Sequence, residues 1–300
     1  MIGRNHLAAG MMNGLVILMC AMPIEGQAVE AGELAVSSVD AEAFRLGALR
    51  AVERYRTPAQ ATLDGYRSVG PDFPGMGVHW LNMSSLIGGK LDPDRPTLLC
   101  YIEIDGSPVL VNVAHGMALL GGQHPPTVAG LPPDPWHEHY GTVEEEMTRP
   151  GGHAGSGQEE ARKTGARVVL FHVWTTPNQA GSFDQHNWAL PFLRAGLAVP
   201  DEPSEFAARF AGLGTETGLR YQLDVVEILF PEKVREEARS QIHGAAEAAV
   251  RWISTLRGRE AVDSVVLSQL DESWRALGVR LVGLAPNEQV ATRVAQLHGV

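Results

Sequence analysis

The chain has 300 residues, of which 44% are hydrophobic and 20% are charged, and its formal net charge at pH 7 is -11. This composition is that of an ordinary globular protein, and the length is enough for one or two domains. The negative charge disfavours two classes of partner, nucleic acids and anionic lipid surfaces, because both need a basic face on the protein.

The first 28 residues have the pattern of a secretory signal peptide. Arg4 gives a positive start, Leu7–Ala21 is a short apolar stretch, and residues 26–28 place small side chains where a signal peptidase cleaves. We therefore expect an exported protein, periplasmic or secreted. The alternative is a buried N-terminal helix. No later segment has the length of apolar sequence that a transmembrane helix needs.

Cysteine usage agrees with export. The chain has two cysteines, Cys20 and Cys100, and removal of the signal peptide would leave Cys100 alone. No internal disulfide could then form. We expect stability to come from the core, from oligomerisation or from a bound metal.

Two helices are predicted before the β-rich part of the chain. In residues 40–56 apolar side chains recur at helical spacing, with charged residues between them. Thr57-Pro58 is typical of an N-cap followed by the first helical residue, and so predicts a second, short helix through Leu63 and Tyr66.

A β-hairpin is the clearest local prediction. Two apolar runs, Leu98–Ile104 and Val109–His115, flank an Asp-Gly turn dipeptide. Side chains alternate between the two faces of a strand. Strict alternation places His115 on the same face as Cys100, and places Asn112 on the opposite face.

A third strand carries a histidine in an apolar run. The sequence of residues 166–174 is ARVVLFHVW, and alternation divides it into two faces that are both apolar. Such a strand is buried on both sides, as in a barrel wall or in a sheet covered by helices. His172 shares its face with Val168, Leu170 and Trp174.

The later part of the chain is predicted to be mostly helical. Residues 121–160 are rich in Gly, Pro, His and Glu, and such a long irregular segment is usually functional or disordered. We expect three parts: a signal peptide (1–28), an α+β core domain (29–198) and a helical C-terminal region (199–300). The predicted fold class is α+β, with an antiparallel or barrel-like sheet.

Five histidines are candidates for a transition-metal site. Neutral imidazole is the commonest nitrogen ligand for zinc, copper and iron, and a catalytic metal site typically uses three protein ligands. We expect His79, His115 and His172 to converge from separate strands, joined by the H-x-H pair His137 and His139. The predicted pocket walls are Trp80, Val113, Leu170 and Trp174.

For each histidine alone, the simpler interpretation is a core imidazole with one satisfied hydrogen bond. The chain has no HExxH, CxxC or zinc-finger spacing, and no Walker or dinucleotide-binding pattern. His186 is a further candidate ligand. The acidic run Glu144–Glu146 is expected to be a solvated face, and Gly75 and Gly77 are expected to allow close backbone approach.

Several motifs resemble a bacterial family of exported single-domain proteins of unknown function. These motifs are PGMGVHW, LDPDRP and FHVWTTPNQAGSF, and the resemblance covers about residues 60–190. It implies a β-rich α+β fold and a tendency to assemble into oligomers. By this resemblance His79 and His172 correspond to the two histidine motifs of the family. The turn after His172 is longer here than the family's Asn-Pro-x-Gly form.

Two functional hypotheses follow. The first is an exported protein with a mononuclear transition-metal site, zinc, copper or iron, which would serve a metal-dependent hydrolase or oxidoreductase acting on a small molecule. The alternative is a non-catalytic ligand-binding or oligomeric envelope protein whose histidines are structural. The two differ in whether the imidazole nitrogens converge.

Overall fold

The computed structural model describes residues 40–132, 135–139, 142–149, 165 and 167–300. Residues 1–28 and part of the segment 121–160 lie outside these ranges, so the signal peptide stays a prediction. Among the described residues, no helix combines the length and apolar character needed to cross a membrane.

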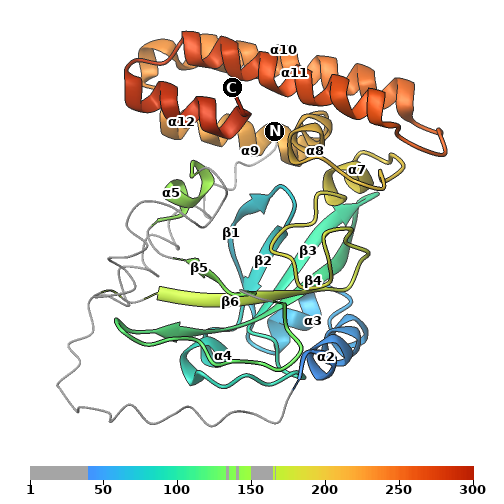
Figure 1. Ribbon diagram of the computed structural model, residues 1–300, viewed down its shortest axis with the longest axis vertical. Helices are drawn as coiled ribbons and strands as arrows, with labels where there is room; N and C mark the ends of the chain where they lie inside the picture. Colours follow the sequence, from blue (N-terminus) through green and yellow to red (C-terminus); the bar gives the residue numbers. More distant parts are fainter. Residues whose placement is uncertain (1–39, 133–134, 140–141, 150–164, 166) are drawn as a thin grey trace, which may run out of the picture.

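One curled antiparallel sheet of six strands lies below the C-terminal helices (Figure 1). Its strand order is β1-β2-β3-β4-β6-β5, and every neighbouring pair is antiparallel. The strands are β1 (Arg67–Phe73), β2 (Gly77–Leu81), β3 (Leu98–Ile104), β4 (Ser107–Leu119), β5 (His137–His139) and β6 (Arg167–Trp174).

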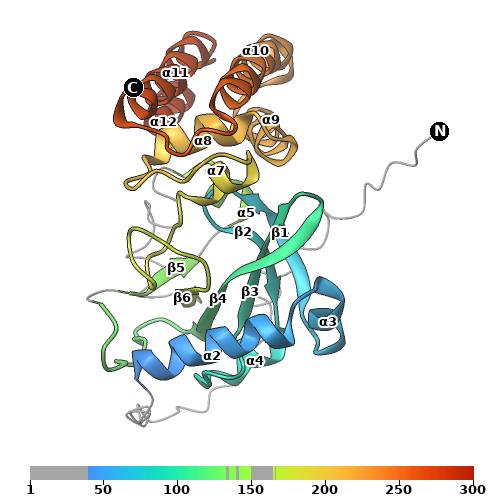
Figure 2. The same ribbon diagram turned by 90° about the vertical axis from the view of Figure 1, so that its right-hand side faces the viewer.

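Both faces of the sheet are covered, which confirms the prediction from the apolar alternation of β6. On one face, Phe171 and Val173 pack with the N-terminal helices α2 (Ala41–Arg54) and α3 (Pro58–Leu63). Figure 2 shows α2 lying across the sheet. On the other face, Leu170 and Trp174 pack near α4 (Met83–Gly88). The α+β prediction is therefore confirmed.

A β-bulge in β4 changes which side chains share a face. Cys100 pairs with Asn112, but the next residue of β3, Tyr101, pairs with Leu110, so Val111 is an extra residue in β4. An extra residue shifts the alternation by one position. From Asn112 onward, every side chain of β4 therefore faces the side opposite to the one that strict alternation predicts.

Two glycines of the PGMGVH motif allow close approach of other parts of the chain. Gly75 has a φ of +77°, and a Cβ there would lie 3.0 Å from the Trp188 ring. Gly77 has a φ of +93°, and a Cβ there would lie 2.5 Å from the carbonyl oxygen of Tyr101. The expectation of close backbone approach is confirmed.

Replacement of Gly77 by alanine is expected to destabilise the protein by about 2–4 kcal/mol, because a left-handed conformation and a clash with backbone are combined. Gly244 is the matched control. It lies exposed inside a helix, and a Cβ at this position would meet no other atom, so Gly244→Ala should stabilise by about 0.5–1 kcal/mol. Urea unfolding of both variants measures this. Equal changes in the free energy of unfolding for the two variants would contradict the close approach at Gly77.

The C-terminal helices form their own apolar core over one end of the sheet (Figure 1). They reach the sheet through α7, which contacts β3, and α9, which contacts β1. The short helix α5 (Val143–Met147) also contacts α9. The remaining helices are α7 (Leu190–Arg194), α8 (Glu205–Leu213), α9 (Glu216–Leu229), α10 (Glu232–Leu256), α11 (Ser264–Gly283) and α12 (Glu288–His298).

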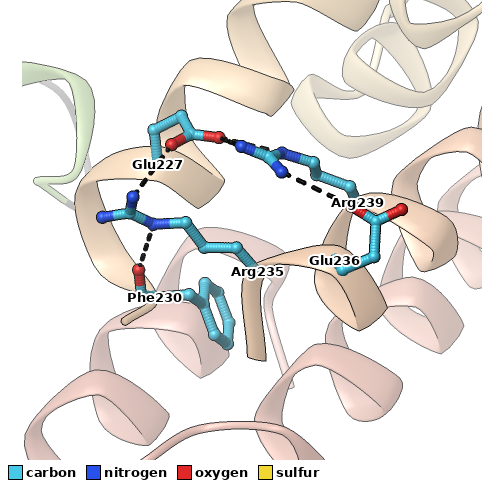
Figure 3. Close-up of polar contacts among 5 residues, drawn as sticks. All are labelled: Glu227, Phe230, Arg235, Glu236 and Arg239. Atoms are coloured by element: carbon cyan, nitrogen blue, oxygen red, sulfur yellow. Dashed lines mark hydrogen bonds and ion pairs between the residues drawn. The ribbon is translucent and has the colours of Figure 1, made fainter. Parts of the chain in front are cut away.

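Charged side chains fix the turn between α9 and α10 (Figure 3). Glu227 pairs with Arg235 at 3.2 Å and with Arg239. Nε of Arg235 donates to the carbonyl oxygen of Phe230 at 2.7 Å, and Arg239 also reaches Glu236 at 3.5 Å. These side chains are about a third or more exposed, so each pair contributes little to stability.

Candidate histidine site

The curl of the sheet brings histidines from three strands together. His79 lies on β2 and His172 on β6, three strand positions apart, which would be roughly 14 Å in a flat sheet. Their ring centroids are 6.4 Å apart. His137 on β5 stacks on His172 with centroids 4.7 Å apart, and His139 lies 5.1 Å from His137. The four rings therefore share one face of the sheet.

Oxygen acceptors orient two of these rings. Nδ1 of His172 lies 2.9 Å from Oδ1 of Asn112, and Nδ1 of His139 lies 3.0 Å from Oε1 of Glu146 on α5. An oxygen acceptor requires the proton on Nδ1, and in the neutral ring of His172 this leaves the lone pair on Nε2. Protein ligands of metals are commonly oriented in this way by a carboxylate or carbonyl oxygen.

Burial keeps the rings of His79, His137 and His172 neutral. It lowers the pKa of His79 to about 3 and lowers the pKa of His137 and of His172 well below the usual value, with the neighbouring histidines acting in the same direction. Nε2 of His79 and Nε2 of His172 are both buried and find no hydrogen-bond partner among the described residues. Two imidazole nitrogens on neighbouring rings are thus left unsatisfied inside the described part of the fold.

His115 does not join this cluster. Because of the bulge at Val111, its ring faces α2, where it packs edge-on against Phe44 and stacks on Phe171. The same shift sends Asn112 to the side of His172. Strict alternation predicted the wrong face for both residues, because a sequence carries no mark of an inserted residue in a strand.

The four residues predicted to line the pocket lie on both faces of the sheet. Trp80 and Val113 pack in the core under α2, whereas Leu170 and Trp174 pack on the histidine side. Trp174 stacks on the cluster ring of His172 with centroids 5.9 Å apart. The four residues therefore do not enclose one pocket.

Two functional residues were missed from the sequence. Asn112 could not be found because its direction depends on the bulge. Glu146 was included in a run expected to be solvated, but its side chain is only 10% exposed, whereas Glu144 and Glu145 are exposed as expected. A period of three to four residues on a short helix is the signal that separates Glu146 from its neighbours.

The histidine side chains, as they are placed, do not form a complete three-ligand metal site among the described residues. In the described part of the chain, no group of three His, Cys, Asp or Glu side chains is arranged to hold one ion. Parallel stacking of His137 on His172 keeps their nitrogens from meeting at one point. A third ligand therefore requires a side-chain rotation of His137 or His139.

Comparisons of the chain with protein-family models, with curated proteins and with solved structures found no match. The family resemblance of residues 60–190 therefore stays a prediction. Function has to be inferred from the geometry of the histidine cluster.

Proposed function

We propose that the histidine cluster binds one divalent transition-metal ion, zinc, copper or iron, and that the exported protein uses it on a small molecule. His79 and His172 are the two ligands, through Nε2, and His137 or His139 turns to supply the third. The observation that carries the proposal is the pair of buried Nε2 atoms, which find no partner among the described residues and belong to rings 6.4 Å apart.

The free-energy cost of leaving buried nitrogens without a hydrogen bond is the reason to expect a ligand between His79 and His172. A buried polar atom without a hydrogen bond costs about 1–3 kcal/mol, and here two such atoms belong to neighbouring rings that one ligand could reach. A metal ion would satisfy both at once. The Asn112 amide and the Glu146 carboxylate already orient neighbouring rings as metal sites require.

Hydrolysis and oxidation are both compatible with these ligands. Zinc held by His79, His172 and a third imidazole would supply a water nucleophile for hydrolysis by lowering the pKa of water to about 7. Copper or iron in the same position would favour oxidation.

The second candidate is a non-catalytic binding or assembly protein with structural histidines. The observation that favours it is the absence, within the described ranges, of three side chains already placed around one point. In that case an apolar residue in place of His172 would fit the core, and would raise stability without changing any metal content.

Metal binding separates the two candidates. We expect about one metal ion per chain in the purified protein, and at least about a hundredfold weaker binding in His79→Leu and in His172→Leu. The measurement is elemental mass spectrometry with competition titration against a chelator. His115→Leu is the matched control, because it removes an equally buried histidine from the other face.

The control variant should bind metal as the wild-type protein does. A wild-type protein that takes up none of the three metals would rule out the proposal. So would an equal loss of metal in His115→Leu, because the effect would then come from general damage to the fold.

A further inference from the structure

A pocket opens beside the histidine cluster, between the sheet and the C-terminal helices. Phe73 of β1 lines it and packs edge-on against His79, with ring centroids 5.5 Å apart. Glu146 lines it as well, and this is the carboxylate that holds His139. Two of the residues that line the pocket, Phe73 and Glu146, therefore also contact rings of the cluster.

Basic side chains dominate the charge of this pocket, although the whole chain carries 35 acidic and 24 basic residues. Arg149 and Arg209 both line it, against the single carboxylate of Glu146. The side chain of Arg209 is 13% exposed, and its Nε donates to Glu205 at 2.8 Å. Within the described part of the chain, its guanidinium pairs with no second carboxylate.

Two further groups of the pocket are neutral and lie close to Arg209. His186 lines the same pocket, and burial together with the charge of Arg209 lowers the pKa of His186 to about 3. Tyr221 also lines it, and burial raises the pKa of its hydroxyl to about 12 against the opposing effect of Arg209. The hydroxyl donates to the carbonyl oxygen of Met147 at 3.2 Å and stays protonated at neutral pH.

We propose that this pocket binds a small anion, a carboxylate or a phosphate, whose oxygen atoms pair with Arg209 beside the histidine cluster. The planar guanidinium fork matches both anions. This inference rests on the proposed function, because it makes the bound anion the substrate of the metal site.

The test is calorimetric titration of the metal-loaded full chain with acetate, succinate and inorganic phosphate at pH 7.5. The two carboxylates and the phosphate distinguish the two anion types. We expect at least one probe to bind the wild-type protein, and to bind Arg209→Gln at least about tenfold more weakly. Arg209→Lys keeps the positive charge but loses the planar guanidinium, and should bind the same probe with intermediate affinity. This variant keeps the test usable if Arg209→Gln folds poorly.

The control is Arg220→Gln, which removes an exposed arginine paired with Glu216 on the adjacent helix and should leave binding unchanged. Equal affinity of Arg209→Gln, Arg209→Lys and wild type, or no binding of any probe, would overturn the inference. Metal content measured on the same samples separates the two proposals. An unchanged metal content without anion binding rejects only the pocket, whereas anion binding without metal rejects only the metal site.

Discussion

Acidification from pH 7 to about pH 4.5 is expected to remove roughly 5 kcal/mol of stability, enough to unfold much of a typical domain. Two buried histidines away from the proposed ligands carry this estimate. Burial lowers the pKa of His115 to about 3 and the pKa of His298 to about 4. In the unfolded chain both have a pKa near 6.5.

The direction follows from which state binds protons. Below about pH 6.5, His115 and His298 bind protons in the unfolded chain but not in the folded protein. Lowering the pH therefore favours the unfolded state. The stability is therefore complete above pH 6.5, and is lost as the pH falls toward the folded values of about 3 and 4. Each histidine contributes about 1.4 kcal/mol per pH unit in this range.

The measurement is urea unfolding at pH 7.5, 6 and 5 with a chelator present, on wild type and His115→Leu. Neither ring nitrogen of His115 has a hydrogen-bond partner among the described residues. The leucine variant should therefore be about 1–3 kcal/mol more stable at pH 7.5. It should also lose about 1.4 kcal/mol less per pH unit. Identical pH slopes for the two proteins would show that His115 does not titrate on unfolding.

Local sequence patterns predicted the elements well. The apolar alternation of β6 predicted burial on both faces, and the Asp-Gly dipeptide predicted the turn of the hairpin between β3 and β4. Apolar spacing predicted α2, a capping residue predicted α3, and the region after residue 199 is mostly helical as expected. Each of these features depends on neighbours within a few residues, which the sequence displays directly.

The candidate site depended on features that are not local. His79, His137 and His172 meet because the sheet curls until β2 approaches β6, and curl is a property of the whole sheet. His115 and Asn112 each lie on the face opposite to the predicted one, because β4 contains one unpaired residue. The histidines of the site could therefore be chosen by residue type, but their partners could not be chosen by counting along a strand.

Loss of the ion pair between Arg194 and Asp72 is expected to destabilise the protein by about 3–5 kcal/mol. Nη2 of Arg194, at the end of α7, lies 2.6 Å from Oδ1 of Asp72 on β1, and the two side chains are only 9% and 15% exposed. Nη1 of Arg194 also donates to Oγ1 of Thr217 on α9 at 3.1 Å. One arginine thus joins the sheet to two helices.

Arg194→Met leaves the carboxylate of Asp72 largely buried without its counter-charge. Burial already raises the pKa of Asp72 above its usual value, and Arg194 opposes this rise. Without the arginine the pKa should rise further. The penalty is then greatest above the folded pKa, where Asp72 is ionised, and becomes smaller as the pH falls and the carboxyl group is protonated.

A double-mutant cycle with Asp72→Leu tests whether the pair or its packing carries the stability. Replacement of both partners by apolar groups of similar size is often neutral, so Arg194→Met/Asp72→Leu should recover most of the loss in urea unfolding. Arg220→Met, in an exposed pair, should cost less than about 1 kcal/mol. If the two single losses simply add in the double variant, the contact between the helices and the sheet depends on packing and not on this charge pair.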